Sequence, residues 1–364
     1  MASRRHEYCG SHVPQSVDCH DKFECEYCHT FITNAKIKKH KNVCPCRPKF
    51  KEYVTNNINT CARSAVPAGV LIDPMDLFCI FDDPFPKLKI FDIDTTTPSD
   101  LFKSNIQEYI LSRILQQYVE ESLLSSNFGL IDFGSGKAEL LHYCRIALKE
   151  LSNVTYIAVD MKTFKFKFDR MFKFNELEGN HKCDLKSCTF RRLQADVKDL
   201  DINNVKELNN IELVGTCKHL CGSATDLGLN CLLNQKSKLF LFAPCCHHRT
   251  TSSSFLYDDR DLPKDKLTIF KKTFAEKYAL SDNINEMFLQ ILPSIAKLSS
   301  WATIKPNERD ANKIEMGRKV KYFLDELRGK YVERQGYKVE HAIYCDISVT
   351  PENRIMACKR INGI

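Results

Sequence analysis

The hydrophobic pattern changes along the chain, and short apolar runs separated by helix-periodic segments dominate from residue 129 onward. Apolar runs of about five residues are typical of strands buried on both faces, whereas apolar residues three and four apart are typical of amphipathic helices. The strand-like pieces are GLIDF (129–133), TYIAVD (155–160), FRRLQAD (190–196), IELVGTCKHLCG (211–222), KLFLFAPCC (238–246), YKVEHAIYCDIS (337–348) and ENRIMACK (352–359). A helical run, KAELLHYCRIALKEL (137–151), separates the first two. Alternating strands and helices predict a doubly wound α/β sheet, and the last two pieces predict an added antiparallel hairpin.

The segment before this alternation has a different pattern. Residues 47–98 are rich in proline and contain no long periodic stretch, which predicts a connector that packs irregularly on the main domain. After Pro98 the apolar spacing becomes helical as far as about residue 124, with Ser99 as the expected N-cap. The expected organisation is therefore a small module at 1–46, the connector at 47–98 and the main domain at 99–364.

Small and acidic residues follow the first three predicted strands. The run Gly134-Ser135-Gly136 lets the backbone approach a ligand closely at a helix N-terminus. Asp160 ends the second strand, where a carboxylate accepts ribose hydroxyls, and Asp196 follows the third, beside the expected adenine position. Glu139 stands where the dinucleotide fingerprint needs a third glycine, so NAD or FAD fits poorly and S-adenosylmethionine fits better. The alternative for both aspartates is ordinary capping of strand-end loops.

An unusual run, APCCHHRT (243–250), follows the fifth predicted strand, and KHLCG (218–222) follows the fourth. In the predicted topology these two segments share the mouth of the site. Three interpretations compete for the run: a metal site, a Cys–His nucleophile pair and a substrate pocket lined by thiols and imidazoles. A metal site would need Cys217, His219 or Cys221 as well, because adjacent cysteines and adjacent histidines are expected to point in different directions. We favour the substrate pocket; simple packing of the cysteines as small hydrophobic residues is the alternative.

Composition narrows the class of protein. The chain has 364 residues of which 43% are hydrophobic, so a sizeable core is expected and wholesale disorder is not. It has no apolar run of the roughly 18 residues that span a bilayer, and its first residues lack a signal-peptide pattern. Its 18 cysteines are then expected as thiols or metal ligands in a reducing, intracellular compartment, cytoplasmic or nuclear. The net charge of +7 is compatible with a polyanionic partner.

The N-terminal module contains a metal-ligand spacing. Cys25 and Cys28, followed by His40 and Cys44, form the pattern C-x2-C…H-x3-C, which supplies the four ligands of a tetrahedral zinc ion. A module this short buries little core, so zinc would supply the folding energy. His29 adjoins Cys28 and is an alternative ligand.

Two further segments of the chain each have two possible interpretations. Cys9 and His12, with Cys19 and His20, form an irregular second set of ligands or simply a polar tail. The segment 161–174, MKTFKFKFDRMFKF, alternates basic and aromatic residues. It suits either stacking and phosphate contacts with RNA or amphipathic packing.

Several longer motifs resemble one eukaryotic family, the tRNA 2′-O-methyltransferases that act on position four of the acceptor stem (the tRNA:m(4)X modification enzymes). The motifs are DFGSGKAEL, CKHLCGSATDLGLNCL, FAPCCHHR, SSWAT, MGRKVKYFLDE and DISVTPENRIMACK. The resemblance covers the zinc module and most of residues 100–360. It implies a Rossmann-like class I methyltransferase domain that transfers a methyl group from S-adenosylmethionine to a ribose 2′-hydroxyl of tRNA. The alternative is a non-catalytic zinc-finger RNA-binding protein with a degenerate core, against which the intact glycine loop argues.

The resemblance also assigns residues. The cofactor set is Phe133, Gly134, Ser135, Gly136, Asp160 and Asp196. The catalytic candidates lie in the KHLCGSATD and CCHH motifs and are Lys218, His219, Asp226 and His247. Among them His219 or His247 is favoured as the base, because imidazole titrates near neutrality. The expected ligands are S-adenosylmethionine, Zn²⁺ and the tRNA acceptor stem.

Overall fold

The computed structural model divides into two compact units, Met1–Glu52 and Tyr53–Ile364. In the first unit the described residues are those of two strands, 22–24 and 31–33. In the second unit they are 69–91, 93, 105–122, 124, 127–151, 153–164, 168–174, 188–304 and 311–361.

The described part of the first unit is an antiparallel strand pair. β1 (Lys22–Glu24) pairs with β2 (Phe31–Thr33), and Phe23 lies opposite Ile32. The predicted zinc ligands lie outside the described residues, as do the candidates for a second site: Cys25, Cys28, His40, Cys44, Cys9 and His12. The zinc module therefore stays a prediction.

An eight-stranded sheet forms the centre of the second unit, in the order β3-β9-β10-β8-β7-β4-β5-β6. The strands are β3 (Lys89–Ile90), β4 (Phe128–Phe133), β5 (Thr155–Val159), β6 (Thr189–Leu193), β7 (Glu212–Cys217), β8 (Leu239–Phe242), β9 (Tyr337–Ile343) and β10 (Arg354–Arg360). All seven strands predicted from the apolar runs are confirmed. β3 is an addition that its two exposed residues did not indicate.

The order of the parallel strands reverses beside β4. The chain runs from β4 outward to β5 and β6, then returns to the other side of β4 as β7 and continues to β8, with all these neighbours parallel. β10 pairs antiparallel with both β8 and β9, which confirms the predicted hairpin. The carboxyl ends of β4 and β7 therefore flank a topological switch point, where doubly wound sheets bind their ligands.

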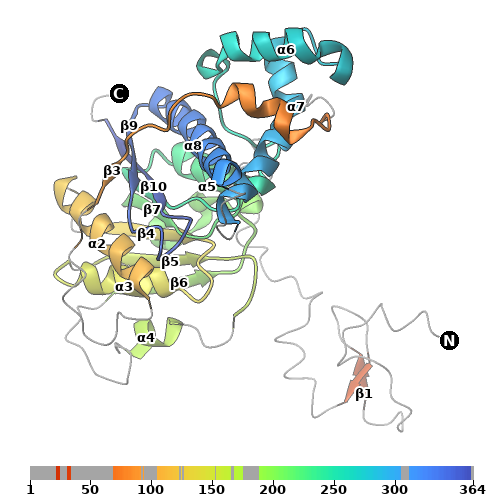
Figure 1. Cartoon of the computed structure of the whole chain (residues 1–364). Helices are drawn as coiled ribbons and strands as arrows, with labels where there is room; N and C mark the ends of the chain where they lie inside the picture. The colour runs from red at the N-terminus through yellow and green to blue at the C-terminus, as the bar shows by residue number, and fades with distance from the viewer. Residues whose placement is uncertain are drawn as a thin grey trace. The chain divides into compact units, whose positions relative to one another are not determined.

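Helices cover both faces of the sheet, with α2 and α3 on one side and α5 and α8 on the other (Figure 1). Right-handed crossovers require this, because the chain moves in opposite directions across the sheet through α3 and through α5. The helices are α2 (Ile106–Glu121), α3 (Glu139–Ala147), α4 (Asp169–Phe174), α5 (Ser223–Asn234), α6 (Lys264–Tyr278), α7 (Ile284–Leu298) and α8 (Ala311–Arg334). Short 3₁₀ helices are Pro74–Ile80, Val197–Asp199, Ile202–Asn204, Lys206–Leu208, His247–Arg249, Asp259–Asp261 and Ser299–Thr303.

The helix predicted after Pro98 is present as α2 among the described residues. α2 starts at Ile106 with Asn105 at its N-cap position, whereas the predicted N-cap, Ser99, lies outside the described residues. Asn105 makes no capping hydrogen bond and instead donates to the Tyr143 hydroxyl of α3 at 3.0 Å. This contact joins the start of α2 to α3, and the prediction of Ser99 as an N-cap stays a prediction.

Two hydrophobic cores hold the unit together. One lies between the sheet and the pair α2 and α3, and it includes Ile114, Leu141 and Tyr156. The other joins α6, α7 and α8, and it includes Leu77 of the proline-rich connector and Phe288. Connector and helices thus share one core. Within the described part of the chain, no helix combines the length and the apolar character needed to cross a membrane.

Candidate active site

A cavity of about 560 Å³ opens at the carboxyl edge of the sheet, at the switch point. Its walls come from the loops after four neighbouring parallel strands: residues 134–137, 160–162, 195–197 and 218–221. Arg249, from the segment after β8, completes one side. Sites of this size and mixed polarity are typical of small-ligand binding. The predicted strand-end residues are thus brought together because parallel strands present their carboxyl ends to one edge.

The loop after β4 wraps the backbone around one end of the cavity. Gly134 has φ +67° and Gly136 has φ +52°, both in the left-handed region that favours glycine. A Cβ on Gly136 would meet nothing within 4 Å, so its backbone faces open space. Arg192 braces the loop by donating to the Gly136 carbonyl at 2.8 Å. Ser135 lines the cavity with the two glycines, whereas Phe133 is fully buried in the strand and does not.

Asp160 ties two of the loops together. Its Oδ2 accepts the Gly136 amide at 2.9 Å, and its Oδ1 accepts the Lys162 amide at 2.8 Å. Each oxygen keeps a second lone pair for a ligand hydroxyl. Asp196 also lines the cavity and accepts the Lys198 amide at 3.1 Å. Both predicted aspartates therefore cap their loops and face the cavity at once, so the two interpretations left open by the sequence are compatible.

The cavity lining also contains three carboxylates that the sequence did not assign to the site, Asp132, Glu108 and Glu139. Asp132 is 2% exposed, and its Oδ1 has no hydrogen-bond partner among the described residues. Desolvation raises the pKa of Asp132 well above its usual range. Glu108 projects from α2 and forms an ion pair with Lys218. Asp132 directly precedes the glycine loop, which was an available signal, whereas Glu108 stands in an ordinary helical run where nothing marks it.

The structure separates the two candidate histidines. His219 lines the cavity, and burial together with the nearby Lys218 ammonium lowers its pKa. His247 is 1% exposed and does not line the cavity; its Nε2 lies 2.7 Å from Oδ1 of Asp325 on α8. Desolvation lowers the pKa of His247, although the neighbouring Asp325 carboxylate acts to raise it. The 3₁₀ turn that begins at His247 directs its imidazole ring into the protein interior rather than toward the cavity.

Asp226, the remaining catalytic candidate, also lies away from the cavity lining. Its carboxylate is completely buried in α5 and accepts two hydrogen bonds from Arg328, both 2.8 Å long. It also accepts the Leu256 amide at 3.1 Å. These contacts describe a buried structural ion pair between α5 and α8.

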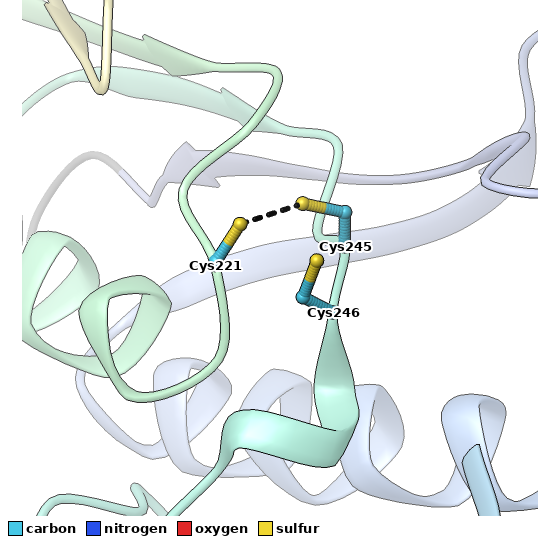
Figure 2. A group of neighbouring side chains, drawn as sticks. All are labelled: Cys221, Cys245 and Cys246. Carbon is cyan, nitrogen blue, oxygen red and sulfur yellow. Dashed lines mark hydrogen bonds between the residues drawn. The ribbon is translucent and has the colours of Figure 1, made fainter. Parts of the chain in front are cut away.

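Three cysteine sulfurs meet at the edge of the cavity (Figure 2). Cys221 lines the cavity, and its Sγ lies 3.5 Å from that of Cys245. The hydrogen bond shared with Cys245 lowers the pKa of Cys221 to about 6, and the same contact raises the pKa of Cys245. The sulfur of Cys246 lies on the same side, and all three sulfurs are within 4.8 Å of one another. The expectation that adjacent cysteines point apart is therefore wrong at this position.

The described residues of the basic and aromatic segment 161–174 have two different environments, the protein interior and the cavity. Phe172 is buried and stacks on Phe190 with ring centroids 4.3 Å apart, so the packing alternative is confirmed for this residue. Lys162 and Phe164, by contrast, line the cavity.

A doubly wound sheet with a cavity of mixed polarity at its switch point defines an α/β domain of the nucleotide-binding type. The family model described as "Methyltransferase TRM13" matches residues 110–316, more than half of the chain. The chain belongs to this family.

Relatives support the same assignment. The tRNA:m(4)X modification enzyme TRM13 of Vanderwaltozyma polyspora is 28% identical over 300 residues, covering 75% of this chain and 65% of that protein. The TRM13 homolog of Mus musculus is 37% identical over 129 residues, covering 35% of this chain and 24% of that protein. The matched regions thus span less than two thirds of either relative. A solved structure, the small RNA methyltransferase HEN1, aligns with a TM-score of 0.34 and 16% identity, covering 74% of this chain and 27% of that one.

Proposed function

We propose that the chain is an S-adenosylmethionine-dependent tRNA methyltransferase that modifies the ribose 2′-hydroxyl of nucleotide four in the acceptor stem. Family membership and the names of the relatives, tRNA:m(4)X modification enzymes, support the substrate class. The observation that carries the proposal is the switch-point cavity, whose walls combine a glycine loop, three aspartates and a histidine.

The unpartnered carboxylate of Asp132 fits this cofactor. A buried carboxylate without a hydrogen bond is costly and calls for a cationic or donor group beside it. S-adenosylmethionine carries an ammonium and a sulfonium, and either positive charge would stabilise the ionised form of Asp132. Asp160 has lone pairs for the ribose hydroxyls, and Asp196 lies on the next loop along the sheet edge, where the base would lie. A dinucleotide would instead bring its pyrophosphate to the glycine loop, beside Asp132, where it could not supply the positive charge that this carboxyl group calls for.

When bound, S-adenosylmethionine supplies a methyl group activated by a positive sulfur, which keeps the electron pair of the broken carbon–sulfur bond. The protein must handle the proton, because a ribose hydroxyl is a poor nucleophile with a high pKa. Of the two candidate histidines, His219 lines the cavity and His247 does not. We therefore assign His219 as the acceptor of the hydroxyl proton. Lys218 beside it is held in place by its ion pair with Glu108.

The test is methyl transfer from labelled S-adenosylmethionine to a tRNA transcript, with nuclease mapping of the product. Label in the 2′-O-methyl nucleotide at position four supports the proposal in full. A transcript with a 2′-deoxy nucleotide at that position should accept no label. Label on a base, or at another ribose, would retain methyl transfer but overturn the assigned target. Cofactor binding without transfer to any tRNA would favour the non-catalytic RNA-binding alternative.

The N-terminal module completes the proposal. Cys25, Cys28, His40 and Cys44 are proposed to hold one zinc ion in a fold that captures tRNA rather than taking part in the chemistry.

A further inference from the structure

The three sulfurs at the cavity edge match the spacing of a metal site. Zinc binds thiolate sulfur at about 2.3 Å, so sulfurs at the corners of one tetrahedron lie about 3.8 Å apart. The sulfurs of Cys221, Cys245 and Cys246 lie within 4.8 Å of one another, and the Cys221–Cys245 pair is 3.5 Å apart. Small shifts of the three side chains, slightly apart for Cys221 and Cys245 and closer for Cys246, would bring all three sulfurs to ligand distance.

This convergence depends on an unusual backbone. Cys246 adopts φ 49° and ψ 41°, the left-handed conformation that a residue with a Cβ enters at a cost of about 1–2 kcal/mol. In an extended strand, successive side chains point to opposite faces. The left-handed turn at Cys246 breaks this alternation, and its sulfur turns back toward that of Cys245 (Figure 2). Strain of this kind persists where the surrounding structure supports a functional arrangement.

A second special position brings the opposite loop close enough. Gly222 has φ +57°, and a Cβ there would lie 2.5 Å from the Cβ of Arg249. Without a side chain, Gly222 donates its amide to the Cys245 carbonyl at 3.3 Å, next to a parallel bridge between Cys221 and Cys245. The loops after β7 and β8 are thus held with their thiols facing each other.

We propose that Cys221, Cys245 and Cys246 bind a zinc ion. Three thiolates are soft ligands that select a thiophilic divalent cation over magnesium or calcium. Among the described residues no fourth His, Cys, Asp or Glu joins the group, so one coordination position remains for water or a bound ligand. The ion would join the loops after β7 and β8 and stabilise the wall that carries His219. This inference is independent of the methyl-transfer proposal, because it depends only on the sulfur geometry.

A disulfide is the competing explanation for two of the three cysteines. Cys221 and Cys245 would need to approach from 3.5 Å to about 2.05 Å. A Cys221–Cys245 disulfide gives Cys246 no role, although the left-handed backbone of Cys246 places its sulfur beside the other two. The two explanations therefore differ in the behaviour of Cys246.

Metal content of the full chain tests the proposal. Zinc per chain is measured by mass spectrometry for the wild type, Cys245→Ser, Cys246→Ser and the control Cys188→Ser. Cys188 is partly buried and lies outside the triad. We expect each triad variant to hold one zinc equivalent less than the wild type and the control to hold the same amount. Zinc in the N-terminal module contributes equally to all four and cancels. Equal zinc in folded triad variants and wild type overturns the proposal.

Labelling of the wild type decides the question even if the variants do not fold. The chain is treated with N-ethylmaleimide before and after removal of metal with a chelator, and modified cysteines are mapped by mass spectrometry. We expect Cys221 and Cys246 to be protected in the metal-loaded chain and modified after chelation. Equal modification before and after chelation, or a Cys221–Cys245 disulfide in the freshly isolated chain, overturns the proposal.

Discussion

Arg328 of α8 donates two hydrogen bonds of 2.8 Å to Asp226 of α5, and both side chains are at most 1% exposed. Breaking one partner of such a pair leaves an uncompensated buried charge, which costs about 3–5 kcal/mol. We expect Asp226→Asn to lower the free energy of unfolding by an amount approaching this range, measured by urea denaturation. The folded variant should keep its affinity for S-adenosylmethionine.

The matched control is Glu326→Gln, which breaks a partly exposed i,i+4 pair with Lys330 on the same helix. Its expected cost is below about 0.5 kcal/mol. If Asp226→Asn keeps wild-type stability but loses methyl transfer, Asp226 belongs to the chemistry after all.

Asp160 and Asp132 should contribute to cofactor affinity in different ways. Asp160→Ala removes an acceptor for ribose hydroxyls and also releases the Gly136 amide. Asp132→Asn keeps the shape but removes the carboxyl group whose ionised form a cationic cofactor would stabilise. Hydrogen bonds to charged groups contribute about 1.5–3 kcal/mol, so each change should weaken binding about tenfold or more. Calorimetric titration with S-adenosylmethionine measures this, and an unchanged dissociation constant for either variant removes that residue from the site.

His219 and His247 should respond differently to replacement. His219→Ala should keep cofactor affinity and slow single-turnover methyl transfer about 10²-fold, the lower range for a lost acid–base group. His247→Ala removes a buried partner of Asp325 and should mainly reduce the free energy of unfolding. A near-wild-type rate for His219→Ala would show that His219 is not the base. A slow but stable His247→Ala would reverse the assignment.

His142 should make the fold sensitive to mild acid. Burial lowers its pKa from 6.5 to about 4, with the Arg145 charge acting in the same direction. The unfolded chain therefore binds this proton more tightly, so stability is lost as the pH falls from 6.5 to about 4 and the loss then levels off. The shift corresponds to about 3 kcal/mol at most. His142→Phe should reduce the loss across this window, as measured by denaturation at several pH values. Carboxylate titrations affect both proteins alike, so identical pH profiles would show that the ring is not held neutral.

Cys44→Ser tests the N-terminal module. The variant should lose the zinc of this module and, with it, the module's fold. Methyl transfer should fall mainly through weaker tRNA binding, visible as a higher KM for tRNA with little change in the rate at saturation. Retention of wild-type zinc content by Cys44→Ser would show that the spacing was misinterpreted.

The sequence alone was enough for seven of the eight strands of the sheet and for the glycine-loop end of the cavity. Buried strands appear as apolar runs, and the chain order of strands and helices restricts the topology to a few arrangements. The glycine loop, Asp160 and Asp196 directly follow their strands, so their convergence at one edge follows from the parallel sheet. Asn105, at the start of α2, donates a hydrogen bond to Tyr143, 38 residues away, and local capping rules contain no information on such a contact.

Tertiary structure alone decided which polar residues line the cavity. His219 and His247 occupy similar places in their motifs, but the left-handed turn at Cys246 sends His247 into the protein toward Asp325. Glu108 meets Lys218 from 110 residues away, and Arg328 meets Asp226 from 102 residues away. Hydrophobic periodicity does not predict such partners, because it indicates which face of an element is buried and not which distant charged residue packs against that element. The same holds for the three sulfurs, whose meeting depends on two left-handed backbone positions that composition and spacing leave undetermined.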